Sequence, residues 1–409
     1  MSHSEGSATV TAQAGFDIAK DFHWLAVTDD RGRLLFSRRV DNTPDAITKA
    51  VAELLAVQEE HGRVAVGLDI IGGIASLLTA MLLAEGLHCV HVPGLAVNRA
   101  RRGTRGGENK SDPRDAKTIA EQVMLRDDLR VVDLPDEESV ELRLLVSHRT
   151  TLVKEATART SRLRDLLAGI HPDLERAVDP TLQSGLVLLG RYVTAGEIRR
   201  AGISRITAYL RRHGVSKQTT AQALAEAAVT AARAQTVSLP GERRTAALVR
   251  ELAAELAAGK ARLKTLDAEI EGLVASHPDG ALIRSLPGMR ATLTAEFIAS
   301  VGNIRRFNSA DALAAASGLA PVLTQSGKVR YSRSATGGDK ALKRVFYQAS
   351  FCSIQRDPTS RAYYDRKRAE GKRHHQALIA LARRKVNVLY AMLRDRQPFQ
   401  ARPPLRLVA

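Results

Sequence analysis

Two aspartates near the start of the chain stand where an acid is unexpected. Asp17 lies between Phe16 and Ile18 in GFDIAKDFHWLAV, whose partly alternating apolar and polar residues predict a strand. Asp69 ends the short apolar run RVAVGLDI, which predicts a second, buried strand. Because a carboxylate in a buried strand is costly unless it has a partner, both positions are candidates for binding.

A second pair of aspartates marks the start of a predicted helix. In KSDPRDAKTIAE, Ser111 or Asp112 can cap the helix and Pro113 suits its first turn. Asp112 and Asp115 are three residues apart, so both can face one side of that turn.

Four carboxylates supplied by two strands and a helix are hard oxygen ligands. Such ligands suit Mg²⁺ or Mn²⁺, which clamp phosphate oxygens. The residues alone leave a second interpretation open, in which the four aspartates are separate helix caps and surface acids. The metal hypothesis therefore needs evidence that the four side chains converge.

A serine near the other end of the chain heads a basic segment. Ser326 precedes Gly327, and only one acid, Asp339, accompanies the six cations that follow it, which are Lys328, Arg330, Arg333, Lys340, Lys343 and Arg344. By itself a serine before glycine is typical of a turn. Attack on a phosphodiester would require the serine to lose its proton and the phosphate charge to be screened, and clustered cations supply the second requirement.

The elements expected around these residues divide the chain into three parts. Residues 1–135 predict two hairpin strands followed by alternating helices and strands, which indicates an α/β sheet. Residues 136–275 predict a long helical spacer, with a small inserted lobe at about 171–240. Residues 276–409 predict a mostly helical domain that contains Ser326.

The spacer carries two heptad seams. The first alternates spacings of four and three and the second spacings of three and four, as in Leu145, Arg149, Leu152, Ala156, Arg159, Leu163 and Leu166, and in Val249, Leu252, Leu256, Gly259, Leu263, Leu266, Ile270 and Leu273. The seams predict an antiparallel pair in one chain, a coiled coil between chains, or both. Arginine in a seam is costly, so we assign Arg149 to nucleic-acid contact rather than to packing.

The C-terminal domain offers two further nucleic-acid contacts. It opens with LPGM, a Pro-Gly turn of the kind with which a helix-hairpin-helix binds backbone phosphate. Its last helices, 361–385, hold nine Lys or Arg residues against two acids. We expect this face, which includes Lys372 and Arg373, to follow a phosphate backbone.

Charge sets the class of partner. The 409 residues carry a formal net charge of +17, which favours a polyanion. No apolar run is long enough to span a membrane, and the first residues lack the pattern of a signal peptide. Two distant cysteines suit a reducing compartment, so we expect a cytoplasmic protein.

The segments GFDIAKDFHWLAV, VGLDIIGG and NKSDPRDA resemble the three motifs of the RuvC-like domain in insertion-sequence-110 family transposases. The segment SGLAPVLTQSGKVRYSRSATGGDKALKRVFYQAS resembles the second conserved block of the same transposases. Both blocks occur in the family's order with a helical spacer between them, so the resemblance covers nearly the whole chain.

The resemblance implies an RNase H-like fold for residues 1–135 and a metal-binding acidic tetrad at Asp17, Asp69, Asp112 and Asp115. Asp69 departs from the family, which has glutamate there and so a side chain one methylene longer. Ser326 matches the serine that attacks DNA and forms a covalent intermediate. The family also implies Mg²⁺ or Mn²⁺, donor and target DNA, a structured non-coding RNA that bridges them, and a homodimer or homotetramer with composite sites.

Two other functions remain open. One is a metal-dependent nuclease of the Holliday-junction resolvase type in which Ser326 is structural. The other is a nucleic-acid-binding protein without catalysis, in which neither the aspartates nor the serine reacts.

Overall fold

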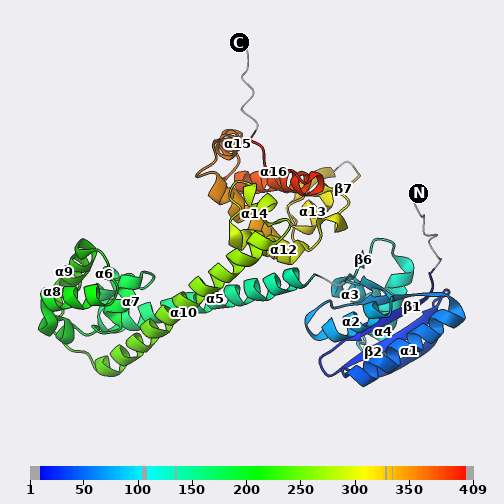
Figure 1. The fold of residues 1–409 in the computed structure, drawn as a ribbon, viewed down its shortest axis with the longest axis horizontal. Helices are drawn as coiled ribbons and strands as arrows, with labels where there is room; N and C mark the ends of the chain where they lie inside the picture. Colours follow the sequence, from blue (N-terminus) through cyan, green and yellow to red (C-terminus); the bar gives the residue numbers. More distant parts are fainter. Residues whose placement is uncertain (1–9, 104–107, 134–135, 328, 334, 402–409) are drawn as a thin grey trace, which may run out of the picture. The chain divides into compact units, whose positions relative to one another are not determined.

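The computed structural model describes residues 10–103, 108–133, 136–327, 329–333 and 335–401. The chain forms two compact units, Met1–Pro135 and Asp136–Ala409. Figure 1 shows a sheet with helices in the first unit and helices almost throughout the second. The expected combination of an N-terminal α/β sheet with a mostly helical remainder is confirmed.

One mixed sheet organises the N-terminal unit. Its strands are β1 (Val10–Ile18), β2 (Phe22–Asp29), β3 (Leu34–Asp41), β4 (Arg63–Leu68), β5 (His88–His91) and β6 (Arg130–Val131). They lie in the order β3-β2-β1-β4-β5-β6. Strand β1 is antiparallel to β2 and parallel to β4, β4 is parallel to β5, and the two edge pairs, β2–β3 and β5–β6, are antiparallel.

Helices cover both faces of this sheet. The helical elements are α1 (Pro44–His61), η1 (Gly73–Ala75), α2 (Ser76–Ala84), α3 (Gly94–Arg102) and α4 (Asp112–Leu125). One face packs Phe16 and Leu68 against α1 and α2 through Ile47, Leu54 and Leu78. The other face carries α4, whose Ile119 packs with Val92 and Val97. The alternation of side chains along β1 and β4 separates these two faces.

Two long helices cross the C-terminal unit side by side (Figure 1). They are α5 (Glu137–Ile170) and α10 (Glu242–Ser276). Ion pairs of 2.6 Å between Arg149 and Asp267 and of 2.9 Å between Arg159 and Glu255 join them. The arginine further along α5 pairs with the acid earlier on α10, so the two helices are antiparallel. Both seams therefore meet within one chain.

A helical lobe packs at one end of this pair. It comprises α6 (Pro172–Ala177), α7 (Gln183–Leu189), α8 (Ala195–Arg212) and α9 (Gln218–Ala234). Gly202 interrupts α8 with a φ of +65°, a backbone conformation that glycine adopts without strain. The lobe shares a core with α5 and α10 through Leu163, Leu167, Val249 and Leu256.

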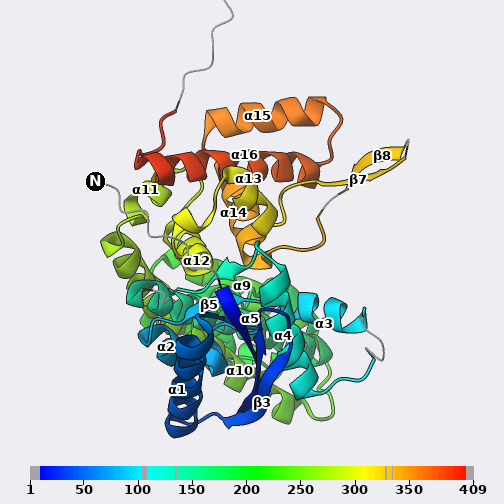
Figure 2. The same cartoon turned by 90° about the vertical axis from the view of Figure 1, so that its right-hand side faces the viewer.

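The remaining elements gather at the other end of the pair (Figures 1 and 2). They are α11 (Gly280–Ser285), α12 (Ala291–Val301), η2 (Ile304–Arg306), α13 (Ala310–Ala316), β7 (Val322–Ser326), β8 (Val329–Arg333), α14 (Lys340–Ser353), α15 (Pro358–Ala369) and α16 (His374–Asp395). Phe297, Phe346 and Leu389 belong to their core. Across the described residues, no helix is both long and apolar enough to cross a membrane.

Candidate active-site residues

Strand register brings Asp17 and Asp69 together. Phe16 on β1 pairs with Leu68 on the parallel strand β4. Asp17 and Asp69, the next residue in each case, therefore lie at the same end of the sheet. The backbone N–H of Ile18 donates to Asp69 Oδ1 at 3.1 Å. Because side chains alternate, Asp17 is on the same sheet face as Gly15, the face that carries α4.

Two glycines let α4 approach this face. Gly15 and Gly67 are register partners on β1 and β4. A Cβ atom at Gly15 would lie 2.1 Å from the carbonyl oxygen of Ala116, and one at Gly67 would lie 2.7 Å from Cγ2 of Ile119. The absence of side chains at both positions therefore lets the helix lie directly on the strands, with its N-terminus beside Asp17.

The start of α4 is built as its sequence predicts. Ser111 occupies the N-cap position, Asp112 and Pro113 open the helix, and the N–H of Asp115 donates to the carbonyl of Ser111 at 2.9 Å. Asp115 is 5% exposed, although acids are rarely buried. A carboxylate in the first helical turn is favoured by the positive end of the helix dipole.

The four acids share one electrostatic environment around Asp17. Burial first, and then the charges of Asp69, Asp115 and Asp112, raise the pKa of Asp17 to about 7, against an opposing effect of Lys110. Burial also raises the pKa of Asp69, with Asp115 contributing to the rise. Mutual repulsion of this kind is relieved when a cation binds among the carboxylates.

A buried arginine completes this cluster. Arg101 on α3 places Nε 2.9 Å from Oδ1 of Asp115, and both side chains are less than a tenth exposed. In the sequence NRARR, nothing in the spacing separates Arg101 from Arg99 and Arg102. Its role as the fixed partner of Asp115 is visible only in the structure.

The donor set fits a hard divalent ion by type and by charge. Carboxylate oxygens are the ligands that Mg²⁺ and Mn²⁺ prefer, and after burial the charges of the other three acids contribute to the raised pKa of Asp17. Within the described ranges, however, no three His, Cys, Asp or Glu side chains converge closely enough to hold a metal ion. The four aspartates lie close enough to affect one another's charge, but their side chains are not arranged as metal ligands.

Ser326 lies in a hairpin rather than in a simple loop. It is the last residue of β7 and pairs with Val329 of β8 across a turn that contains Gly327 at φ +53°. The sequence predicted a mostly helical domain here, without a hairpin. Figure 2 shows β7 and β8 projecting from the helices of the C-terminal unit. Ser326 is exposed, and so are Leu323 and Tyr331, at 50% and 53%.

The two segments that connect the hairpin to the domain pass close to each other at a pair of glycines. The N–H of Asp339 donates to the carbonyl of Ala316 at 2.6 Å. Gly318 and Gly338 both have positive φ, and a Cβ on Gly338 would lie 2.5 Å from the amide nitrogen of Gly318. The chain therefore leaves and re-enters the domain at one point, and the returning segment leads directly into α14.

The basic residues assigned to nucleic acid lie in different settings. Arg330 and Arg333 are exposed on β8, Lys340 is exposed at the start of α14, and Lys343 is half-buried one turn on. Lys328 lies outside the described residues. Arg344 places Nη2 2.5 Å from Oε1 of Glu296 on α12, a partner that sequence reasoning missed.

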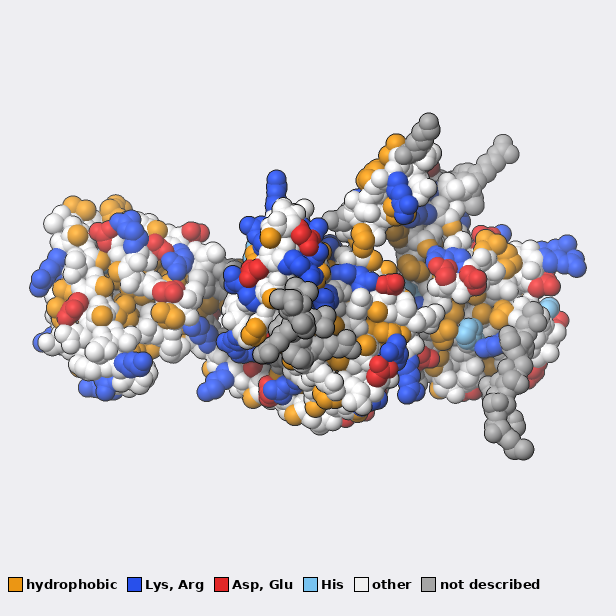
Figure 3. All heavy atoms as spheres, turned by 90° about the horizontal axis from the view of Figure 1, so that it is seen from above, with side chains coloured by type: hydrophobic (Ala, Val, Ile, Leu, Met, Phe, Trp, Pro, Cys, Tyr) orange, Lys and Arg blue, Asp and Glu red, His pale blue; other side chains and the backbone are white. Residues whose placement is uncertain are grey.

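The more distant basic residues differ again. Lys372 and Arg373 lie in the turn between α15 and α16, where Lys372 is half-buried and Arg373 is exposed. The face drawn in Figure 3 carries many Lys and Arg side chains with acids among them. Arg149 instead forms the 2.6 Å ion pair with Asp267 across the long helices, with 26% of its side chain exposed. The structure thus gives Arg149 a protein partner at the seam.

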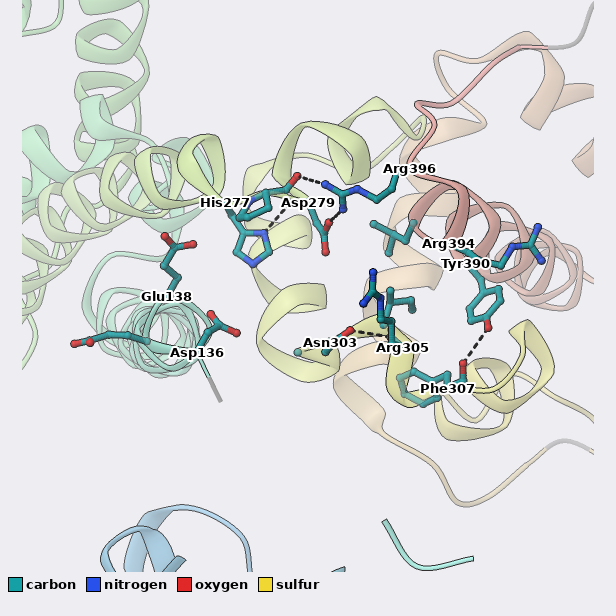
Figure 4. A pocket seen from close by; sticks show the side chains of 15 residues that line it. Asp136, Glu138, His277, Asp279, Asn303, Arg305, Phe307, Tyr390, Arg394 and Arg396 are labelled. Atoms are coloured by element: carbon teal, nitrogen blue, oxygen red, sulfur yellow. Dashed lines mark hydrogen bonds and ion pairs between the residues drawn. The ribbon is translucent and has the colours of Figure 1, made fainter. Parts of the chain in front are cut away.

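A pocket of about 740 Å³ lies elsewhere in the C-terminal unit (Figure 4). Acids and bases line it together, and several pair with each other, as Arg396 does with Asp279. The hydroxyl of Tyr390 donates to the carbonyl of Phe307 at 2.9 Å. None of the four aspartates, nor Ser326, lines this pocket, and its mixed charge favours no class of ligand.

Comparisons with known proteins bear on both ends of the chain. A transposase profile of the IS110 type with an acidic DEDD set matches residues 14–172, and a profile described as transposase IS116/IS110/IS902 family matches residues 280–365. The chain is 40% identical to the 44.8 kDa protein of insertion element IS116 from Streptomyces clavuligerus, over 97% of this chain and 98% of that one.

Two further relatives differ in extent. The 42 kDa protein of insertion element IS900 from Mycobacterium paratuberculosis is 40% identical over 93% of this chain and 95% of its own. The pilin gene-inverting protein of Moraxella bovis is 31% identical over 34% of this chain and 45% of its own.

A basic chain that joins a carboxylate-bearing α/β unit to a helical unit, and that matches two transposase profiles, is a DNA recombination enzyme of the transposase class. The chain belongs to the IS110 family of insertion-element transposases.

Proposed function

We propose that this transposase excises and inserts a mobile element through a covalent serine–DNA intermediate, with Ser326 as nucleophile and Asp17, Asp69, Asp112 and Asp115 as ligands of Mg²⁺ or Mn²⁺. The observation that carries the proposal is the clustering of the four aspartates at one end of the sheet, where burial first, and then the charges of Asp69, Asp115 and Asp112, raise the pKa of Asp17 to about 7. The strand order β3-β2-β1-β4-β5 with α4 on one face is consistent with an RNase H-like fold.

Each chemical step of the proposal conserves atoms and charge. The Oγ of Ser326 bonds to phosphorus as the bond from phosphorus to the leaving strand oxygen breaks. The serine proton is lost, and the leaving oxygen gains one. A hydroxyl of the new strand later attacks the same phosphorus, breaks its bond to Oγ and restores the serine. Because the ester retains the energy of the broken bond, no nucleotide cofactor is required. A bound divalent ion would neutralise charge on the phosphate.

The exposed hairpin supports the role of Ser326. A hydroxyl at the end of an isolated two-stranded arm is accessible to a large substrate, and the arm's cations, Arg330 and Arg333, can screen phosphate charge. Asp115 and Arg101 hold the start of α4 near Asp17, so that the acids keep their arrangement when phosphate approaches.

The proposal includes the partners that the family resemblance implies. These are donor and target DNA, a structured non-coding RNA that bridges them, and a second or further copies of the chain. Contact between copies through α5 is supported by the apolar side chain of Leu144, which remains 67% exposed. The net charge of +17 suits two polyanions.

Substitution separates this proposal from its alternatives. Ser326→Ala and Asp17→Asn should each retain DNA binding and lose strand exchange, measured with a supercoiled donor, a target plasmid and the element's RNA. Full strand cleavage by Ser326→Ala would favour the nuclease of the resolvase type. Unchanged activity of the double variant Asp17→Ala, Asp115→Ala would favour a protein without catalysis.

A further inference from the structure

A buried carboxylate sits inside the core of the C-terminal domain. Glu296 on α12 is 3% exposed and is followed by Phe297, which packs edge-to-face on Phe346 at 5.8 Å. Its Oε1 accepts from Arg344, and Oε2 has no hydrogen-bond partner among the described residues. Burial of a charged group with half of its oxygens unsatisfied is costly, and a buried ion pair is weak evidence for a stabilising role.

The arginine that Glu296 holds remains open to solvent. The side chain of Arg344 is 53% exposed although one nitrogen contacts a buried oxygen. A guanidinium has five N–H donors in a planar fork, so the contact with Glu296 leaves donors for a second anion. Glu296 therefore holds the guanidinium of Arg344 from the protein core, while the rest of the guanidinium faces solvent.

The surroundings of Arg344 favour an anion. Lys340 lies four residues earlier on the same face of α14, and like charges at this spacing repel. Lys340 and Lys343 are also in the first turn of the helix, where the dipole already presents positive charge. At the N-terminus of α14, the N–H of Asp339 donates to the carbonyl of Ala316 at the end of α13, where the chain leaves for the arm that carries Ser326.

We propose that Glu296 is a positioning residue that fixes the guanidinium of Arg344 for contact with a DNA backbone phosphate beside the Ser326 arm. The inference rests on the proposed function, because it requires this domain to bind DNA. Fixing the arginine in advance removes rotamer freedom that would otherwise be lost on binding. Arg344 contacts the phosphate, and Glu296 acts only through Arg344.

As a general negative charge and as a residue that orients Arg344, Glu296 would affect DNA affinity in opposite directions. Glu296→Gln removes a negative charge, so general electrostatics alone would tighten DNA binding. If Glu296 orients Arg344, the same change weakens binding, by about tenfold for one charge-assisted contact. The assay is fluorescence anisotropy of a labelled mixed-sequence DNA duplex with the full chain, over a series of salt concentrations.

Matched variants complete the design. Arg344→Gln should weaken binding and reduce the slope of log Kd against log salt by about 0.9, the value for one phosphate contact. Glu296→Gln combined with Arg344→Gln should bind no more weakly than Arg344→Gln alone. Glu271→Gln is the control, because Glu271 also pairs with a partly exposed arginine, Arg284, at 2.6 Å, and should leave binding unchanged or slightly tighter.

Circular dichroism melting establishes that each variant is folded. Should Glu296→Gln unfold, Arg344→Lys decides, because it keeps the charge but loses the planar fork, and we expect weaker binding with an unchanged salt slope. Wild-type affinity or tighter binding in folded Glu296→Gln, or in Arg344→Lys, would overturn the inference. A wild-type chain that binds no duplex would overturn the proposed function and this inference with it.

Discussion

The glycine on which α4 rests gives the sharpest test of how the acidic site is positioned. Gly15→Ala adds a Cβ atom 2.1 Å from the carbonyl oxygen of Ala116, 2.6 Å from the amide nitrogen of Ala120 and 2.9 Å from Cβ of Ile119. All three neighbours belong to α4, and two are backbone atoms that cannot rotate away. Restoring ordinary contact requires α4 to move from the sheet by about 1 Å.

That movement has a calculable cost. Overpacking of this size destabilises a core by about 1–3 kcal/mol, which raises local opening of α4 roughly 5- to 150-fold. It also moves Asp112 and Asp115 relative to Asp17, and a displacement of about 1 Å can reduce a reaction about a hundredfold. Hydrogen exchange followed by mass spectrometry measures the opening of peptides from α4, and a strand-exchange assay measures the activity.

Gly94→Ala is the matched control, because a Cβ on Gly94 meets no atom within 4 Å. We expect wild-type exchange and activity for this variant. If Gly15→Ala also showed wild-type exchange in α4 and full activity, the close packing of the helix on β1 would not position the acids, and the reasoning would be refuted.

The remaining predictions concern pH, metal, the hairpin and the long helices. The pKa of Asp17 is raised from 3.8 to about 7 in the folded protein, so between these pH values the folded state binds more protons than the unfolded state. The melting temperature in EDTA should therefore fall as pH rises from about 4 to about 7. Asp17→Asn should lessen this fall. At pH 8, Mn²⁺ should raise the melting temperature of the wild-type chain more than that of Asp17→Asn, and EDTA should abolish strand cleavage; equal shifts in both proteins would count against a metal site at Asp17. Gly338→Ala, which places a Cβ 2.5 Å from the nitrogen of Gly318, should abolish strand exchange while Gly337→Ala, with no atom within 4 Å, retains it. Arg149→Asp should lower the melting temperature and Arg149→Asp with Asp267→Arg should recover most of the loss, whereas an unrelieved loss of DNA binding in the double variant would return Arg149 to a nucleic-acid contact.

The sequence predicted the elements whose periodicity is local. The strand around Asp17, the strand that ends before Asp69 and the helix that opens at Asp112 follow from alternation, apolar runs and helix-start residues, and the structure has each of them. Long helices follow from the heptad seams in the same way. The choice between pairing within a chain and between chains could not be read from the seams, because both pairings bury the same positions.

Tertiary partners were beyond the sequence. Nothing in the spacing of NRARR singles out Arg101 as the partner of Asp115, and nothing in TAEFIAS marks Glu296 as more than one acid on an apolar helix. The β7–β8 hairpin escaped prediction because its two strands are only five residues each and their apolar residues, including Leu323 and Tyr331, are exposed instead of packing on a core. The role of Gly15 could not be predicted for a related reason, because the helix that packs against it lies about 100 residues further along the chain.

Trapping of the covalent intermediate tests the central claim most directly. The full chain is incubated with labelled donor DNA, the element's RNA and Mn²⁺, denatured, and digested for mass spectrometry of any DNA-linked peptide. The account predicts a phosphodiester-linked adduct on Ser326 that disappears in Ser326→Ala and in Asp17→Asn, while Ser332→Ala still forms it. Strand cleavage without a linked peptide, or an adduct on another residue, would contradict it.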